Sequence, residues 1–352
     1  MRWTRQSRGH RVYSDDEQHV QLILRTLGID EERWSATLDR YVDLVPSDAG
    51  VDARLAALAR AFRDAGPTPT TLPDLANVSC VACGANAVSA VVAKPASPTP
   101  LVYGRCGSCG HGQRLTGPNV DDVYQNADYY RLRSPDGTGY TAYADERQYR
   151  EAKGARLLDF LEQRLGSKPQ SLLEVGSGFG YTLAAAAQRG WRTLGVDVNP
   201  AAARAARAIY GFETLTATLE QALSERRVTE GDWDVVLYGF VLEHLESPSA
   251  ELRAARRALA PGGCLALVVP NMEACELDVF GSAYRSLRSD HLHLFSARSL
   301  RLLLTACGLD VVQLNSHCNL HLFRGFLEPA ELEALYRAGR GPDLTILARS
   351  RP

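Results

Sequence analysis

The chain has 352 residues, of which 45% are hydrophobic and 23% charged, a balance that is typical of a globular protein and argues against wholesale disorder. Lys and Arg number 39 against 41 Asp and Glu, so the formal net charge is -2 at pH 7. No global basic field exists to hold nucleic acid or an anionic membrane. The length predicts one principal α/β domain with one or two smaller units.

The first twenty residues are polar and charged, and no segment approaches the about 20 apolar residues that span a bilayer. We therefore expect a cytoplasmic protein without a membrane partner. Eight cysteines are present, four of them in two tight CxxC pairs and four scattered singly. This distribution favours reduced thiols and a metal site over a disulfide framework.

Composition shifts divide the chain into four expected units. Helix-spaced apolar positions precede a Pro/Thr-rich stretch that ends at Pro73, and they predict a small helical unit. A cysteine module, a Tyr-rich segment with a helix, and a region of alternating strands and helices follow. The expected units are 1–73 (helical), 74–120 (zinc ribbon), 121–165 (Tyr-rich lid and helix) and 166–352 (α/β domain).

The two cysteine pairs are Cys80-x-x-Cys83-Gly and Cys106-x-x-Cys109-Gly, with 22 residues between them. This spacing is typical of a zinc ribbon in which four thiolates hold a structural ion and each following glycine frees backbone N–H groups for the sulfurs. A redox dithiol is the alternative, although a thioredoxin-like motif would carry one CxxC within a βαβ unit.

The last unit predicts a parallel sheet with helices on both faces. Short apolar runs alternate there with Ala-rich helical stretches. Strands are expected at 171–175, 193–196, 234–237, 264–269, 310–314 and 344–348, and helices at 151–165 and 300–307.

A glycine loop follows the first of these strands. It contains Gly176, Gly178 and Gly180, and Asp197 ends the next strand 21 residues after Gly176. Glycines allow a ligand to approach the backbone, and an acid at this distance can bind ribose hydroxyls, so the pattern predicts a nucleoside cofactor. Glu174 at the strand end would repel a pyrophosphate, which favours S-adenosylmethionine over a nicotinamide dinucleotide. A tight turn without a ligand is the other interpretation.

Four motifs together resemble the class I S-adenosylmethionine-dependent methyltransferases of the small-molecule group: Leu173–Gly180, Gly195–Pro200, Trp233–Pro248 and Leu259–Asn271. The resemblance implies a Rossmann-like domain with a seven-stranded, mostly parallel sheet. It also implies that Glu174 and the glycine loop lie along the methionine part of the cofactor, that Asp197 binds the ribose, and that Val198 flanks the adenine.

Glu243 and His244 follow the fourth strand at its carboxyl end, where ligands bind in open α/β sheets. His244 is the candidate general base and Glu243 a residue that orients it; alternatively, both brace the loop. Similar quinone-type O-methyltransferases hold a divalent ion with a further acid three positions earlier. That position is Phe240 here, which argues against a catalytic metal.

Other residues are candidates for enclosing the ligands. Tyr140 and Tyr143 resemble a segment that closes over the cofactor in relatives, where aromatic rings attract a sulfonium; packing beneath the cysteine module is the alternative. The segment 271–295 contains Tyr284, Arg285, His291 and His293, and we expect it to line the acceptor pocket. Its His-x-His pair is interpreted as a packed or surface pair rather than a metal-binding one.

The expected reaction is methyl transfer to oxygen or nitrogen, in preference to carbon, of a small metabolite in natural-product tailoring. A zinc module before a class I domain also resembles sugar C-methyltransferases, which continue into a large C-terminal domain, whereas this sequence ends soon after its last strand. A nucleotide-sugar C-methyltransferase is therefore one alternative. A cofactor-binding regulatory protein without turnover is the other.

Overall fold

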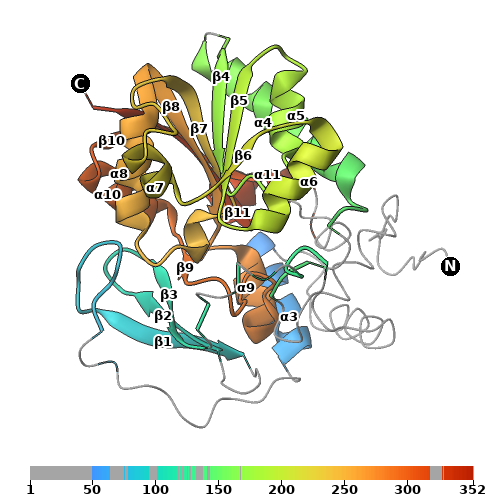
Figure 1. Cartoon of the computed structure of the whole chain (residues 1–352). Helices are drawn as coiled ribbons and strands as arrows, with labels where there is room; N and C mark the ends of the chain where they lie inside the picture. The colour runs from blue at the N-terminus through green and yellow to red at the C-terminus, as the bar shows by residue number, and fades with distance from the viewer. Residues whose placement is uncertain are drawn as a thin grey trace, which may run out of the picture.

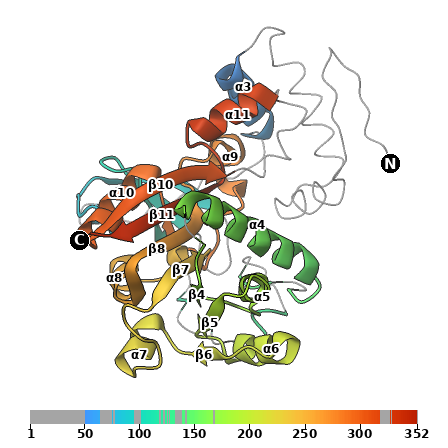
Figure 2. The same ribbon diagram turned by 90° about the horizontal axis from the view of Figure 1, so that it is seen from above.

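The computed structural model shows an α/β domain joined to a smaller β-sheet (Figure 1). The expected helical unit at 1–73 lies largely outside the described residues, and its described part contains helix α3 (Val51–Arg63). Helix α3 lies beside α9 (Cys275–Phe280) and α11 (Pro329–Arg337) (Figure 2). The structure describes residues 50–351 except 64–74, 76–77, 95–100, 118, 121–122, 125, 127, 132–137, 141–142, 167, 318–326 and 328.

The larger sheet has seven strands in the order β10-β11-β8-β7-β4-β5-β6. The run from β8 to β6 is parallel, while β11 is antiparallel to both of its neighbours. This confirms the expected Rossmann-like, mostly parallel sheet. Its strands are β4 (Ser171–Val175), β5 (Arg192–Asp197), β6 (Thr214–Thr216), β7 (Trp233–Gly239), β8 (Leu259–Pro270), β10 (Leu309–His317) and β11 (Asp343–Ser350).

Helices cover both faces of this sheet (Figure 2). Because successive residues of a strand point to opposite faces, Leu172 packs with α4 and α5, whereas Leu173 packs in the cluster that includes α7, α8 and α10. Both leucines are fully buried, as expected for a central parallel strand. The helices are α4 (Arg147–Leu165), α5 (Tyr181–Ala187), α6 (Pro200–Tyr210), α7 (Leu219–Ser224), α8 (Pro248–Ala258) and α10 (Ala297–Ala306).

The smaller sheet combines strands from two of the expected units. β1 (Val88–Lys94), β2 (Leu101–Cys106) and β3 (Gly112–Thr116) come from the cysteine module, and β9 (His293–Leu294) comes from the α/β domain. Buried side chains of both parts form one cluster that includes Leu101, Met272 and Leu294. The module is therefore packed into the domain rather than attached to it by a tether alone.

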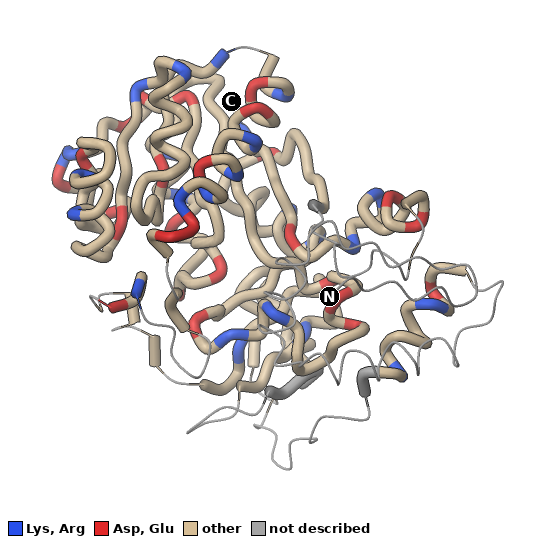
Figure 3. Tube along the Cα trace, turned by 90° about the vertical axis from the view of Figure 1, so that its right-hand side faces the viewer, with Lys and Arg blue, Asp and Glu red and all other residues tan. Residues whose placement is uncertain are grey.

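Basic and acidic residues are interspersed along the described part of the chain (Figure 3). Within that part, none of the helices combines the length and the apolar character needed to cross a bilayer.

Candidate active site

A cavity of about 750 Å³ opens at the carboxyl ends of the parallel strands, a size within the range of small-molecule sites. Its wall includes Gly176 after β4, Asp197 at the end of β5, and Gly239 at the end of β7. In an open α/β sheet this edge is where ligands bind. The cavity therefore lies at the edge where the sequence analysis places the ligand.

The glycine loop is shaped by residues in the left-handed region. Gly176, Gly178 and Gly180 have φ angles of 67°, 53° and 81°. A Cβ atom on Gly176 would lie 2.3 Å from Val241, and one on Gly178 would lie 2.8 Å from the Tyr143 hydroxyl oxygen. Of the three glycines, Gly176 alone lines the cavity; Gly180 begins α5.

Asp197 and Val198 line the cavity as the resemblance implies, but Asp197 already has partners within the protein. Its carboxylate accepts hydrogen bonds from the backbone N–H groups of Gly178 and Asn199, both at 2.8 Å, and from the Tyr130 hydroxyl at 3.3 Å. Burial raises the pKa of Asp197, while these bonds oppose the rise. The carboxylate therefore positions the loop while it faces the cavity.

Glu174 does not line the cavity. It shares the face of β4 that carries Leu172, and its carboxyl group accepts hydrogen bonds from Thr182 and from the Leu183 backbone at the start of α5. Burial raises its pKa to about 8, and its Oε2 atom has no partner among the described residues. Strand alternation thus directs this side chain beneath α5.

Tyr140 and Tyr143 line the cavity, within an aromatic cluster that packs on the glycine loop and α6. The ring centroids of Tyr143 and Phe179 lie 4.9 Å apart. The guanidinium of Arg150 lies 3.9 Å from the Tyr143 ring centroid, a cation–π contact that fixes the ring. The Tyr-rich segment therefore covers the loop rather than the underside of the cysteine module.

Glu243 and His244 lie in a short 3-10 helix (Leu242–His244) after β7, and both line the cavity. The His244 Nδ1 atom is 2.7 Å from the Asp290 carbonyl oxygen and 2.7 Å from the Tyr124 hydroxyl. Because a carbonyl oxygen can only accept, we assign the ring proton to Nδ1 and the lone pair to Nε2. The Phe240 carbonyl is a further hydrogen-bond partner of the ring. Burial lowers the pKa of His244, so the ring is neutral at neutral pH.

Glu243 is fully buried, and neither carboxyl oxygen has a hydrogen-bond partner among the described residues. Burial raises its pKa well above the usual value, so we expect a neutral acid. Its Oε1 atom lies 4.0 Å from Nε2 of His244. The His291 ring lies 4.8 Å from that of His244, and its Nδ1 donates to the Ser286 carbonyl at 2.9 Å.

The His-x-His pair is split between two environments. His291 faces His244, whereas His293 faces His111 of the cysteine module, with Nδ1 3.2 Å from Nε2 of His111. The other nitrogen of His293 donates to the Leu245 carbonyl at 3.0 Å. His291 precedes the strand β9 (His293–Leu294), so the period of two that would place residues 291 and 293 on one face of a strand does not apply, and the two imidazoles have different partners.

The segment that holds His244 is itself fixed by the cysteine module. The hydroxyl of Tyr103, on β2, lies 2.6 Å from the carbonyl oxygens of both Arg288 and His291. On the other side, the Leu292 N–H donates to the Glu243 carbonyl at 2.8 Å. The sequence analysis did not single out Tyr103, Tyr124 or Asp290 as site residues. Tyr103 contacts two backbone carbonyls and Asp290 holds His244 through its own carbonyl, and a backbone carbonyl carries no side-chain signal.

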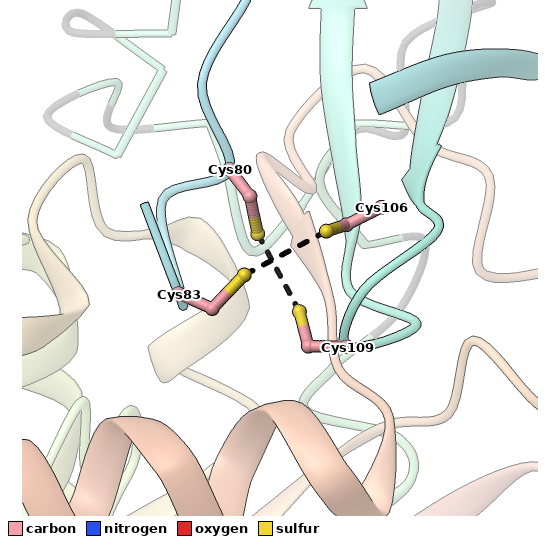
Figure 4. A group of neighbouring side chains, drawn as sticks. All are labelled: Cys80, Cys83, Cys106 and Cys109. Atoms are coloured by element: carbon pink, nitrogen blue, oxygen red, sulfur yellow. Dashed lines mark hydrogen bonds between the residues drawn. The ribbon is translucent and has the colours of Figure 1, made fainter. Parts of the chain in front are cut away.

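The four module cysteines converge (Figure 4). Sγ of Cys80 lies 3.5 Å from that of Cys109, and Sγ of Cys83 lies 3.7 Å from that of Cys106. Among the described residues, two groups could hold a metal ion: these cysteines, and Glu243 with His244 and His291, whose ligand atoms lie within 4.8 Å of one another.

Part of the chain is similar to known proteins. Residues 144–314 match the family model described as a methyltransferase domain. The ubiquinone biosynthesis O-methyltransferase of Pseudomonas paraeruginosa is 30% identical over 132 residues, which cover 36% of this chain and 56% of the relative. That of Hydrogenovibrio crunogenus is 25% identical over 183 residues, covering 51% and 65%.

A solved S-adenosylmethionine-dependent methyltransferase from Archaeoglobus fulgidus aligns with a TM-score of 0.44 and 18% identity, covering 59% of this chain and 99% of that one. The seven-stranded sheet and the cavity at its carboxyl edge define a Rossmann-like α/β domain. Residues 144–314 of this domain match the methyltransferase-domain model, and the chain spans about half to two thirds of the length of these curated relatives.

Replacing Tyr103 by Phe should loosen the segment that holds His244, because one buried hydroxyl shared by two carbonyls is lost. We expect a cost of about 1–3 kcal/mol in the free energy of unfolding, together with faster amide exchange at Leu292 and His244. Tyr284→Phe is the matched control, since that buried hydroxyl contacts the carbonyls of Asn271 and Pro342. Equal exchange at Leu292 in both variants would contradict this prediction.

Proposed function

We propose that the protein transfers the methyl group of S-adenosylmethionine to an oxygen or nitrogen atom of a small metabolite, as a tailoring step in natural-product synthesis. The observation that carries the proposal is one cavity with a buried carboxylate, Asp197, towards β5 and a neutral imidazole, His244, after β7. A cytoplasmic location and the absence of nucleic-acid and membrane partners are part of the proposal.

The residues of the β5 and β6 side fit a nucleoside cofactor. Ala217, Thr218 and Leu219 line the cavity beside Val198, and they offer apolar and hydroxyl contacts to a base. Each oxygen of a carboxylate has two lone pairs, so Asp197 can accept from ribose hydroxyls in addition to its backbone partners. Bound there, S-adenosylmethionine supplies a sulfonium methyl that is itself reactive.

The protein's own contribution is alignment and proton transfer. His244, with its Nδ1–H directed to the Asp290 carbonyl, presents Nε2 to the hydroxyl or amine of the acceptor. Nε2 would take the acceptor's proton as the acceptor's oxygen or nitrogen displaced the methyl group from sulfur, and the sulfur would leave as neutral S-adenosylhomocysteine. The nearby Asp290 carboxylate favours the imidazolium that forms, while a neutral Glu243 adds no further charge.

The cysteine cluster fits a structural zinc ion. Zn–S bonds of about 2.3 Å in a tetrahedral site place sulfurs about 3.8 Å apart, close to the 3.5 and 3.7 Å observed. The N–H groups of Gly84 and Gly110 donate to the Cys80 and Cys106 carbonyls at 2.8 Å, forming two tight knuckles. Four thiolates without an ion would repel one another.

Replacing Asp197 by Ala should weaken binding of S-adenosylhomocysteine by at least tenfold, because a hydrogen bond to a charged group contributes about 1.5–3 kcal/mol. Isothermal calorimetry would measure this, with Asp310→Ala as a control on an exposed carboxylate. Unchanged affinity would remove the ribose assignment. Binding of a nicotinamide dinucleotide in place of S-adenosylhomocysteine would overturn the proposed function.

Replacing His244 by Gln should reduce the methylation rate about 10²–10⁴-fold while leaving affinity for S-adenosylhomocysteine unchanged. Because burial lowers the pKa of His244 below 6.5, wild-type activity should be level above about pH 7 and should fall only at lower pH, where Nε2 gains a proton. The acceptor would come from a metabolite panel screened with labelled methyl donor, which also reveals O-, N- or C-methylation.

If His244 is the general base, the fall in activity at low pH should be absent from His244→Gln. Persistence of that fall in the variant would contradict the assignment of His244 as the base. Tight cofactor binding without turnover across the panel would favour the regulatory alternative. Exchange of a sugar proton with deuterated solvent would favour the nucleotide-sugar C-methyltransferase.

Metal analysis should find one zinc ion per chain, bound by four thiolates, and Cys83→Ser should lower both the zinc content and the thermal stability. Cobalt substitution should produce thiolate-to-metal absorption bands. Folded protein without metal would contradict the ribbon. A second metal equivalent that disappears in His291→Ala would reassign His244 from base to ligand.

A further inference from the structure

One face of helix α4 forms part of the cavity wall. Tyr149, Arg150 and Lys153 line the cavity together with Glu146 just before the helix, and positions three and four apart share a helix face. Gly154 packs closely on α5, where an added Cβ would lie 3.0 Å from Cα of Thr182. This close contact fixes where the helix holds Lys153.

Lys153 differs from the other cations of the cavity wall. Its ammonium makes no hydrogen bond or ion pair with any residue that the structure describes, and it lies over the ring of Phe240, whose centroid is 4.2 Å from Nζ. The guanidinium groups are each paired: Arg150 with Glu146 at 2.6 Å, Arg285 with Asp343 at 3.3 Å, and Arg288 with Asp290 at 2.7 Å.

The side chain of Lys153 is exposed and lines the cavity, so its ammonium is available to a ligand. Burial lowers the pKa of Lys153 to about 8, against an opposing effect of Asp343. At pH 7 the ammonium is therefore still largely charged. An anionic group in the cavity would pair with it in a medium where Coulomb attraction is stronger than in water.

The sheet order places Lys153 over the acceptor half of the cavity. The nucleoside contacts come from β5 and the β6 end, whereas Phe240 follows β7 and Asp343 begins β11, on the other side of β4. His244 also follows β7. An anion held by Lys153 therefore lies on the side of the base, away from the ribose-binding carboxylate.

We propose that the methyl acceptor is a small organic acid whose carboxylate is bound by Lys153, with the ring of Phe240 against its carbon skeleton. This inference rests on the proposed methyl transfer, because it names the acceptor class for the same cavity. Phe240 itself has a φ angle of 60°, a conformation that is uncommon for a bulky residue and that clusters at functional sites. Lys153 is a specificity-determining residue in this proposal.

The test uses benzoate and acetate as carboxylate probes and benzyl alcohol as the neutral match, titrated into full-length protein with and without saturating S-adenosylhomocysteine. Lys153→Met should weaken binding of both carboxylates at least tenfold. Lys153→Arg should keep their affinity within about threefold of wild type. The exposed Lys168→Met is the control. Binding of benzyl alcohol should not change.

Other results would contradict the carboxylate site, the acceptor assignment or the methyl transfer. Failure of wild type to bind either carboxylate, or equal affinity in Lys153→Met, overturns the acceptor class. A tenfold loss of S-adenosylhomocysteine affinity in Lys153→Met with carboxylate binding intact would assign the lysine to the cofactor instead. Carboxylate binding through Lys153 in a protein that ignores S-adenosylhomocysteine would keep the anion site and overturn the methyltransferase function.

Discussion

The hydrogen bond from Nδ1 of His244 to the Asp290 carbonyl is the constraint on which the proposed chemistry depends. It sets the tautomer, and a tautomer decides whether an imidazole can accept a proton at a given point. Backbone carbonyls are reliable partners only where their segment is rigid. Here the segment lies between two sheets, with the Tyr103 hydroxyl on one side and the Leu292 bond to Glu243 on the other.

This arrangement gives the cysteine module a role in the geometry of the cavity. β9 completes the module's sheet, and the Ser296 hydroxyl donates to the Cys109 carbonyl at 2.6 Å. A two-residue strand has little stability of its own, so its position depends on the packing around it. A metal ion that orders the cysteine knuckles would therefore also order the loop that holds the base.

Most charged groups in the described cavity wall are paired or kept neutral. Buried charges are tolerated when they are paired or neutralised, and most of the wall follows this rule: Arg288 is paired with Asp290, and burial disfavours ionisation of Glu243. Lys153 differs from them, because its side chain is exposed and makes no ion pair with a described residue. An anionic ligand would give the Lys153 ammonium the charge partner that the described residues do not supply.

The sequence alone determined the parts whose signals are local. Strand runs, the glycine loop, Asp197 at the end of β5 and the CxxC spacing lie within short segments, where side-chain periodicity and backbone requirements are legible. The tertiary structure decided the rest: that Glu174 lies under α5, that His291 faces His244, and that β9 joins the module's sheet. These depend on contacts between residues far apart in the chain, many through backbone carbonyls that every residue has, so no local pattern distinguishes them.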